Sequence, residues 1–298
     1  MTPANATAQQ ARPAALPPRR KSRLWGRIWR DKFVLLSILF LAALVLATTI
    51  AHLLQIDAST ARLQTRLLDP SWQHPMGTDA LGRDILLRII LGAANSLLIG
   101  LGSVLIAAGF GTFMGVMAGY FGGRWDAFVM RLVEIQFAFP NLLVIIAVVY
   151  FFAASLPILI MVLAAVYWMV FATVVRSAVL GVKNSLYVRS AHFAGCSNGW
   201  IIWHHILPAV APILLTQAMI EFAAIVLAES GLSFLGLGVQ PPAASWGLMI
   251  AENRDYMDIA WWSVLFPGLA IVCTVLAANL IGSALRVWLD PRQSAERS

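Results

Sequence analysis

Long uncharged runs of hydrophobic residues are the feature that most restricts how this chain can fold. The runs cover residues 33–54, 89–123, 135–175 and 259–285. A helix needs roughly 20 mainly apolar residues to cross the hydrocarbon core of a bilayer, so every run is long enough to do so. Only 12% of the residues are charged, whereas soluble domains average about 25%. The sequence therefore predicts an all-α integral membrane protein.

The lengths of these runs predict six transmembrane helices. The run 135–175 can hold two helices, and Ala153-Ala154-Ser155-Leu156-Pro157 is the natural hairpin between them. A further helix is expected from Pro208 to about Leu227. The predicted organisation is, in order, a cytoplasmic N-terminal segment (1–32), a first transmembrane helix (33–54), an extracytoplasmic segment (55–88), a core with five transmembrane helices (89–285) and a cytoplasmic C-terminus (286–298).

The basic residues predict the orientation in the membrane. Residues 1–32 are expected to be disordered, and they contain eight Lys and Arg residues but a single acid, Asp31. With six spans, the side that holds both termini carries 16 of the 21 basic residues. Because basic loops stay in the cytoplasm, we expect both termini there. The net charge of +7 then reflects topology and contact with anionic membrane lipid, and it does not indicate nucleic acid.

Two motifs that would indicate an enzyme, a zinc-protease helix and a phosphate loop, are missing from the sequence. The adjacent pair His204-His205 points to different faces of a helix, unlike the i, i+4 pair of a zinc protease. A Walker A phosphate loop needs a Gly-Lys pair, and none of the lysines follows a glycine. We therefore expect no catalytic residue, no metal and no cofactor on this chain. If ATP drives the protein, another chain binds it.

Small residues recur every four positions in the second predicted transmembrane helix. They are Ser103, Ala107, Gly111, Gly115 and Gly119. Positions i and i+4 share one helix face, where missing side chains allow another backbone to approach closely. We interpret this stripe as a helix-packing surface, whose partner lies either in this chain or in another subunit.

Two glutamates belong to the fifth predicted helix. Glu221 lies 13 residues after Pro208, which is about 20 Å along a helix at 1.5 Å per residue. Exposure of an ionisable group to lipid at that depth is costly. Glu221 therefore lines a substrate path, pairs across a helix interface, or lies nearer the surface than this placement suggests. Glu229 is a lower-ranked candidate for the pathway or a helix interface, because near the outer end of the helix it is expected to be more easily hydrated.

The predicted extracytoplasmic segment ends in the polar motif Gly77-Thr78-Asp79-Ala80-Leu81-Gly82-Arg83-Asp84. Thr78 or Asp79 is expected to cap the helix that follows, because both side chains accept hydrogen bonds from the free amides at a helix start. The motif also offers an outer surface that meets a soluble partner or shapes the pore entrance. The two interpretations are compatible.

Residues 184–208 predict two short helices between transmembrane helices. Asn184 or Ser185 caps the first (186–194), and Gly195 ends it as a C′ glycine does. The second covers residues 199–205 and leads to Pro208, which opens the next transmembrane helix. Both short helices present apolar side chains on the cytoplasmic side. They lie on the lipid surface or fit a groove on a cytoplasmic partner.

This segment resembles the cytoplasmic EAA loop of permease subunits of bacterial ABC importers. The pattern of that loop is Glu-Ala-Ala, three residues, Gly, and later Leu-Pro. The last alanine, the glycine and the Leu-Pro pair match in identity and spacing, whereas Arg189 and Ser190 replace the glutamate and the first alanine. The resemblance assigns to this ATPase-coupling loop the residues Tyr187, Arg189, Ser190, Ala191, Gly195, Leu207 and Pro208.

Further motifs resemble the dipeptide/oligopeptide/nickel branch of these permeases. The most specific is Leu232–Pro242, which reads LSFLGLGVQPP and is followed by Ser245-Trp246-Gly247. The outer motif 77–84 and three shorter stretches (118–123, 137–140 and 289–292) also match. The resemblance covers the chain from about Lys32 to Arg292 and is greatest to the C-type permeases of dipeptide-transport systems.

The resemblance implies a type I ABC importer permease fold in the bacterial cytoplasmic (inner) membrane. It implies a complex in which a second, paralogous permease completes the pore, two cytoplasmic ATPases bind ATP and Mg, and an extracytoplasmic protein delivers the substrate. This chain would form half of the pathway for dipeptides or short peptides and would work by alternating access. Nickel or other metal chelates and glutathione are alternative substrates within the same branch.

Arg189 is the main departure from the pattern, and it implies a partner ATPase with a complementary acidic surface.

A proton-coupled secondary transporter with Glu221 as its relay is an alternative, although such folds usually show internal repeats and more intramembrane charge. A membrane enzyme would need a nucleophile–base or metal arrangement, and none is visible in the sequence. A structural membrane scaffold is a further alternative. ATP-dependent flux distinguishes these alternatives from an ABC permease.

Overall fold

A computed structural model describes residues 31–152 and 155–289, and these residues form helices and no strand. The helices are α2 (Lys32–Leu53), α3 (Ile85–Val116), α4 (Gly123–Phe137), α5 (Asn141–Phe152), α6 (Leu156–Lys183), α7 (Leu186–Phe193), α8 (Asn198–Ile201), α9 (Leu207–Phe234), α10 (Trp246–Asn253) and α11 (Trp262–Leu289). Two π-helical segments, Met117–Phe121 and Ile202–Ile206, extend α3 and join α8 to α9. Most of the segment predicted to be disordered (1–32), and the C-terminus from residue 290, lie outside the described residues.

Five helices are long and apolar enough to cross a membrane. They are α2, α3 with its π-helical extension, α6, the continuous helix Asn198–Phe234 and α11. The pair α4 and α5 is bent by 85° at a short break and gives six spans if it counts as one. The prediction of six spans is consistent with this count, whereas the side of the membrane on which each terminus lies stays a prediction.

The third predicted span is not a straight helix, contrary to expectation. A single helix was expected to start at Ile135, but α4 ends at Phe137 and α5 begins only at Asn141. Pro140 explains the break, because proline has no amide hydrogen to donate and disfavours the helical conformation of the residue before it. The predicted hairpin lies where α5 ends and α6 begins. Ser155 is the N-cap of α6, and Pro157 lies in the first turn of that helix. Residues 153–154 lie outside the described residues.

The fifth predicted span is longer than expected at both ends. It ends at Phe234 instead of Leu227, and Pro208 lies in the first turn of α9 without starting a separate helix. Proline has no amide hydrogen to donate, and Pro208 comes directly after a π-helical segment, where the regular α-helical hydrogen-bond pattern is already interrupted. The π-helical segment Ile202–Ile206 carries the backbone from α8 directly into α9. The second short helix of the segment 184–208 is therefore continuous with a transmembrane helix.

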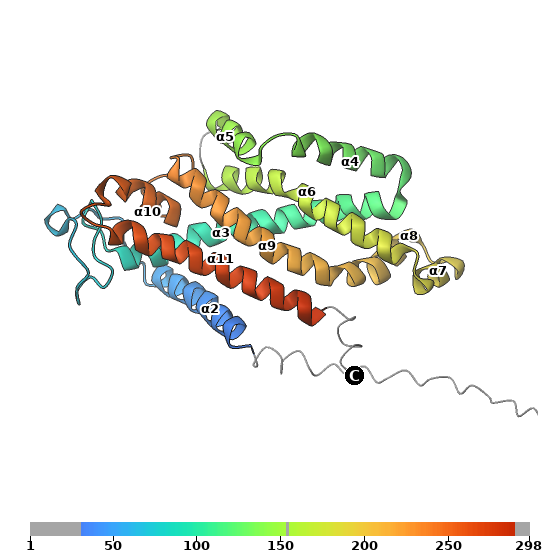
Figure 1. The fold of residues 1–298 in the computed structure, drawn as a ribbon, viewed down its shortest axis with the longest axis horizontal. Coiled ribbons are helices and arrows are strands. Elements are labelled where there is room, and N and C mark those ends of the chain that lie inside the picture. Colours follow the sequence, from blue (N-terminus) through green and yellow to red (C-terminus); the bar gives the residue numbers. More distant parts are fainter. Residues whose placement is uncertain (1–30, 153–154, 290–298) are drawn as a thin grey trace, which may run out of the picture.

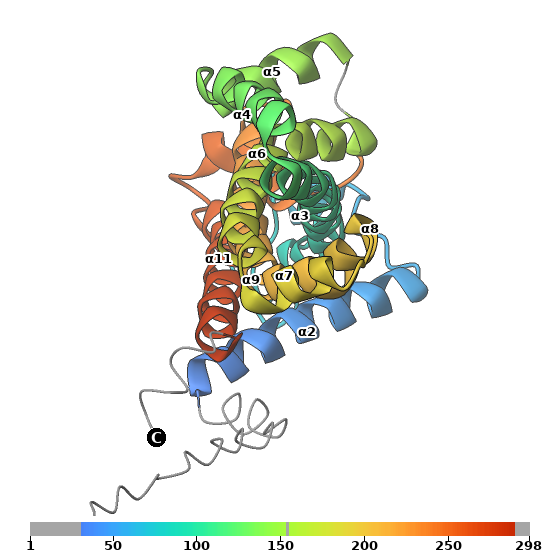
Figure 2. The same cartoon turned by 90° about the vertical axis from the view of Figure 1, so that its right-hand side faces the viewer.

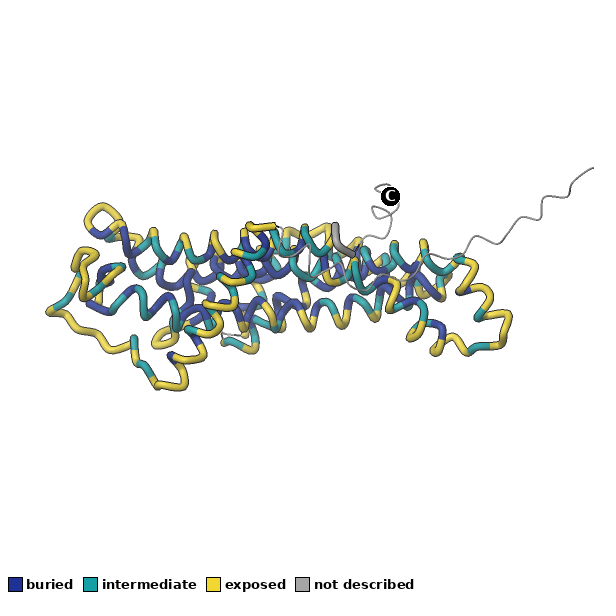
Figure 3. Tube along the Cα trace, turned by 90° about the horizontal axis from the view of Figure 1, so that it is seen from below, coloured by how far each residue is buried: buried dark blue, intermediate teal, exposed yellow. Residues whose placement is uncertain are grey.

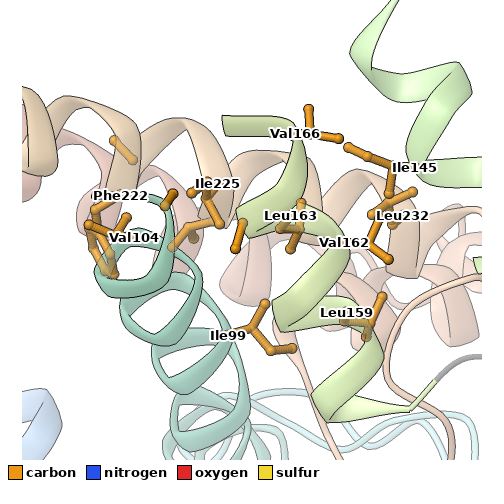
Figure 4. Packing of buried hydrophobic residues seen from close by; sticks show 14 of the residues in the cluster. Ile99, Val104, Ile145, Leu159, Val162, Leu163, Val166, Phe222, Ile225 and Leu232 are labelled. Atoms are coloured by element: carbon orange, nitrogen blue, oxygen red, sulfur yellow. The ribbon is translucent and has the colours of Figure 1, made fainter. Parts of the chain in front are cut away.

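The central bundle consists of α3, α6 and α9, which pack against one another along their lengths (Figure 1). Helix α11 packs on α9, and α2 lies against α11 and α3, while α4 and α5 lie on the opposite side of the bundle (Figure 2). Buried residues follow the central helices, and exposed residues gather at the two ends (Figure 3). Figure 4 shows the core, to which α3 contributes Ile99, α6 contributes Leu163 and α9 contributes Ile225.

The stripe of small residues on α3 packs against α6 in the same chain. A Cβ atom added at Gly115 would lie 2.6 Å from the carbonyl oxygen of Ala172, and one added at Gly119 would lie 2.9 Å from Cβ of Val179. Any larger residue would force the two backbones apart. The predicted packing surface is confirmed, and its partner is internal.

Candidate functional site

The segment 184–208 forms the end of the molecule opposite the outer motif 77–84 (Figure 1). Ser185 is the N-cap of α7, although its side chain makes no capping hydrogen bond. Gly195 adopts φ = +80° and its amide donates to the carbonyl of His192 at 3.0 Å. A positive φ strains any residue with a Cβ atom, which explains the glycine. The predicted first helix with its C′ glycine is confirmed.

A second apolar core fixes this segment to the ends of three long helices. Val188 of α7, Ile201 of α8 and Ile206 pack with Val116 of α3 and Val179 of α6, and all five are buried. Ala191 and Leu207 lie at the edge of this core. Because α7 and α8 share a core with α3, α6 and α9, a force on the short helices is transmitted directly to the bundle.

The outward face of the segment is apolar and basic. Leu186 and Phe193 are 83% and 81% exposed, and Tyr187 and Trp203 are also exposed. Arg189 and Ser190 are exposed beside them. Exposed apolar groups rimmed by polar residues are typical of protein or membrane interaction sites.

A cavity of about 340 Å³ lies behind this face, between α7 and the end of α3. Its lining includes Lys183, Arg189 and His192, and none of its lining residues is acidic. On its wall the Tyr120 hydroxyl donates to the side-chain oxygen of Asn198 at 3.0 Å. The cavity therefore favours an acidic group.

The adjacent histidines His204 and His205 take part in aromatic packing. The His204 ring stacks on Trp200 with centroids 4.5 Å apart, and His205 meets Trp200 edge-on. No group of three or more metal-binding side chains occurs among residues 31–152 and 155–289.

One motif in this segment was missed by sequence reasoning. Gly195-Cys196-Ser197-Asn198-Gly199 has the Gly-x-Ser-x-Gly spacing of a hydrolase nucleophile elbow. Such an elbow joins a strand to a helix, whereas this turn joins α7 to α8. Ser197 is the N-cap of α8, and its hydroxyl oxygen accepts from the amide of Trp200 at 3.4 Å. The serine therefore caps a helix.

The outer motif builds a buried cluster of charges. The Asp79 carboxylate accepts from Arg83 Nε at 2.7 Å and from Arg88 Nη1 at 2.7 Å. The same two arginines donate to Glu252 of α10 at 2.7 and 2.9 Å. Asn253 of α10 accepts from the Ala80 amide at 3.1 Å. The motif 77–84 is thus bonded to α10, which lies about 170 residues later in the chain.

The predicted helix cap in this motif is wrong. Asp84, not Thr78 or Asp79, is the N-cap of α3, and its Oδ1 accepts from the Leu87 amide at 3.0 Å. Thr78 donates to the carbonyl of Thr65. Gly77 and Gly82 occupy the turns on either side, with φ of +74° and +75°. Asp79 serves the arginine cluster instead, since charge-assisted hydrogen bonds to two buried guanidinium groups are stronger than a single helix cap.

Three partners in this cluster, Arg88, Glu252 and Asn253, could not be identified from the sequence. Their spacing follows no motif, because the contacts join segments that only the fold brings together. The one available signal was charge. Arg88 borders a long uncharged run and Glu252 belongs to a short apolar stretch, and a buried charge requires a partner.

The structure reverses the predicted order of burial of the two glutamates. Glu221 is 7% exposed, and its Oε1 accepts from Gln217 one turn earlier at 2.7 Å. Glu229 was expected to be more easily hydrated, yet it is 0% exposed. The reason is the loop 235–245, which folds back over the end of α9 and covers Glu229 with Ser245 at the start of α10.

Comparison with known proteins agrees with this architecture. Residues 111–295, more than half the chain, match the family model described as binding-protein-dependent transport system inner membrane component. The chain is 37% identical to the dipeptide transport system permease protein DppC of Alkalihalophilus pseudofirmus, over 94% of this chain and 92% of that protein. It is 41% identical to a putative peptide transport system permease protein of Brucella suis, over 95% and 94%.

A third relative has another transport activity in its name. The glutathione transport system permease protein GsiD of Pectobacterium atrosepticum is 37% identical over 90% of each chain. All three relatives are matched along nearly their full length, as is this chain. The chain is therefore a multi-pass membrane protein that belongs to the family of inner membrane components of binding-protein-dependent transport systems.

Proposed function

We propose that this chain is one permease subunit of an ATP-driven importer of dipeptides or short peptides. It forms half of the translocation pathway and works by alternating access. The observation that carries the proposal is the segment 184–208, which has an exposed apolar and basic face and a core shared with three transmembrane helices. The dipeptide and peptide permeases among its relatives support the substrate class.

The partners follow from this role. A second, paralogous permease completes the pathway, and two cytoplasmic ATPases bind ATP and Mg. An extracytoplasmic protein delivers the substrate to the opposite end of the molecule. Exposed Trp72 and Leu63 near the outer motif support this docking surface, because exposed apolar side chains are typical of interaction sites. In this assembly both termini and residues 184–208 are cytoplasmic.

ATP would act through the equilibrium between two conformations. A ligand shifts such an equilibrium only by binding one conformation more tightly than the other. ATP closes the ATPases, and their closure moves α7 and α8. Because these helices share a core with α3, α6 and α9, the bundle moves with them.

Arg189 specifies the chemistry of the contact with the ATPase. It lies on the rim of the basic cavity with Lys183 and His192. An ATPase with a basic groove would be repelled at this position, so the partner presents an acidic side chain to Arg189. This requirement distinguishes the complex from importers whose loop carries a glutamate there.

Reconstitution tests the proposed function. The chain is co-expressed with its second permease and ATPases, and the purified complex is placed in lipid vesicles. We expect uptake of radiolabelled dipeptides that requires ATP, the binding protein and hydrolysis-competent ATPases. A protonophore should leave the uptake unchanged. Uptake that persists with ATPase-dead partners and stops with the protonophore would instead show a proton-coupled transporter.

Glutathione is a second candidate substrate, favoured by the similarity to a glutathione permease. A competition assay with unlabelled dipeptide, glutathione and nickel chelates ranks the candidates. Ligand binding by the cognate extracytoplasmic protein should show the same order. Dipeptides should compete most effectively, and a complex that takes up only glutathione or a nickel chelate would contradict the peptide assignment.

A further inference from the structure

Glu229 on α9 is a fully buried acid that the proposed transport cycle does not use. No ion pair reaches it from the part of the chain that the structure describes. Its two oxygens instead accept from serine hydroxyl groups. Ser233 Oγ of α9 donates to Oε1 at 2.7 Å, and Ser96 Oγ of α3 donates to Oε2 at 3.4 Å. The carboxylate thus joins two transmembrane helices.

Both serines are in turn held by the first turn of α10. Ser245, the N-cap of α10, donates to Ser233 Oγ at 3.2 Å and accepts from the Leu248 amide at 3.3 Å. The amide of Trp246 donates to Ser96 Oγ at 3.4 Å. Two chains of hydrogen bonds therefore run from the start of α10 to the two oxygens of Glu229. Such networks are rigid when every member is satisfied and are strongly disrupted when one member is lost.

The other end of α10 is fastened to the outer surface. Glu252 accepts from Arg83 and Arg88, and Asn253 accepts from the Ala80 amide. Helix α10 has only eight residues. It is therefore a short rigid connection between the outer motif 77–84 and Glu229.

Beyond Glu229 the connection continues to the cytoplasmic end. The helix Asn198–Phe234 spans 37 residues, which is about 55 Å at 1.5 Å per residue. Glu229 lies near one end of this helix, and α8 of the segment 184–208 is its other end. A displacement of α10 at the outer surface consequently reaches the ATPase-facing segment through one continuous element.

We propose that Glu229 is a positioning residue that holds α10 to α9 and α3. Through it, docking of a substrate-loaded binding protein on the outer motif shifts α9 and so the segment that faces the ATPases. The inference rests on the proposed function and adds the route by which the two surfaces communicate. Tightly packed elements have discrete arrangements instead of deforming continuously, so loss of the connection should decouple the two ends.

The test measures ATP hydrolysis by the complete complex in lipid vesicles, with and without substrate-loaded binding protein. Glu229→Ala removes both acceptor oxygens. Allosteric coupling typically amounts to about 5- to 150-fold, and we expect stimulation to fall about tenfold while unstimulated hydrolysis persists. Glu229→Gln retains the shape and one acceptor oxygen and should fall in between. Full stimulation in Glu229→Ala would overturn the proposal.

Thr216→Val is the matched control. Thr216 is a buried hydroxyl on the same helix, but it donates only to the Pro212 carbonyl of its own helix at 3.0 Å. It should retain stimulation. If Glu229→Ala does not assemble, Ser233→Ala removes one of the two hydrogen-bond chains at smaller structural cost. Equal stimulation in Ser233→Ala and Thr216→Val would then contradict the proposal.

A second variant tests whether the two ends of α10 act in series. Glu252→Ala releases the outer end, and it should reduce stimulation as Glu229→Ala does. The double variant should be no worse than either single one, because each cuts the same connection. Multiplicative losses would show independent effects and refute the route through α10.

A reversible cross-link provides a rescue experiment. A Cβ atom at Gly92 of α3 would lie 3.6 Å from Cβ of Ala244, within the range of disulfides. The substitutions Gly92→Cys and Ala244→Cys are made in the Glu229→Ala chain after Cys196 and Cys273 are replaced by alanine. Oxidation should restore stimulation and reductant should abolish it. A cross-link that blocks stimulation in the chain with Glu229 intact would overturn the proposal.

The outcomes distinguish failure of this inference from failure of the proposed function. A complex that hydrolyses ATP and is stimulated equally with and without Glu229 retains the importer role and loses the route. A chain that never assembles with ATPases contradicts the importer role itself.

Discussion

Replacing Arg88 by methionine should destabilise the protein more than any exposed charge substitution. Arg88 is 2% exposed and donates to both Asp79 and Glu252 at 2.7 and 2.9 Å. Methionine fills a similar volume but leaves these two carboxylates with Arg83 alone. Removal of one partner from a buried ion pair costs about 3–5 kcal/mol, because an uncompensated charge remains buried. We expect a loss of that size in the free energy of unfolding.

Arg131→Met is the matched control. Arg131 and Glu134 are 76% and 63% exposed, and their atoms are 3.3 Å apart. Exposed pairs of this kind contribute about 0–1 kcal/mol. Unfolding of the purified chain is followed in mixed micelles of mild detergent and SDS, where the midpoint should shift strongly for Arg88→Met and little for Arg131→Met. Equal shifts for the two variants would refute the reasoning that burial of the charge cluster determines the loss.

Three further predictions concern coupling, the path and packing. Arg189→Glu should lower substrate-stimulated ATP hydrolysis by about tenfold, which corresponds to roughly 1.4 kcal/mol of lost coupling, while membrane insertion survives. Unchanged stimulation would remove Arg189 from the docking surface. Glu221→Gln should leave most dipeptide uptake in vesicles, because Gln217 is its hydrogen-bond partner and an amide preserves that contact; complete loss of uptake would identify a proton relay. Gly115→Val should lower the free energy of unfolding of the bundle by about 1–3 kcal/mol through overpacking. Gly109→Val is its control, because an added Cβ atom there meets nothing within 4 Å. The control should unfold at nearly the same SDS fraction as the unmodified chain.

Features set by local sequence were predictable. Hydrophobic length locates the transmembrane helices, and the four-residue interval of small side chains locates the surface that packs on α6. Gly195 marks the end of α7 because its backbone requirement is local. In each case the cause lies within a few residues of its effect.

Features set by distant contacts were not predictable. In the sequence Asp79 looks like a helix cap, but in the structure it accepts hydrogen bonds from Arg83 and Arg88. Arg83 also donates to Glu252, which lies about 170 residues later in the chain. Glu229 was placed too near water because the return of the loop 235–245 cannot be deduced from the helix that carries it. The break at Pro140 was signalled locally by the proline itself. It was overlooked because Pro140 lies within a long uncharged run that was interpreted by its length alone.

The basic rim formed by Lys183, Arg189 and His192 has a consequence for a cell that contains several related importers. With a reversed charge at the proposed ATPase contact, this permease would be a poor substitute in another complex, and a foreign ATPase would be a poor substitute in this one. Specificity of this kind comes from repulsion of wrong partners as much as from attraction of the right one. Arg189 would then keep the subunits of this importer from being exchanged with those of its relatives.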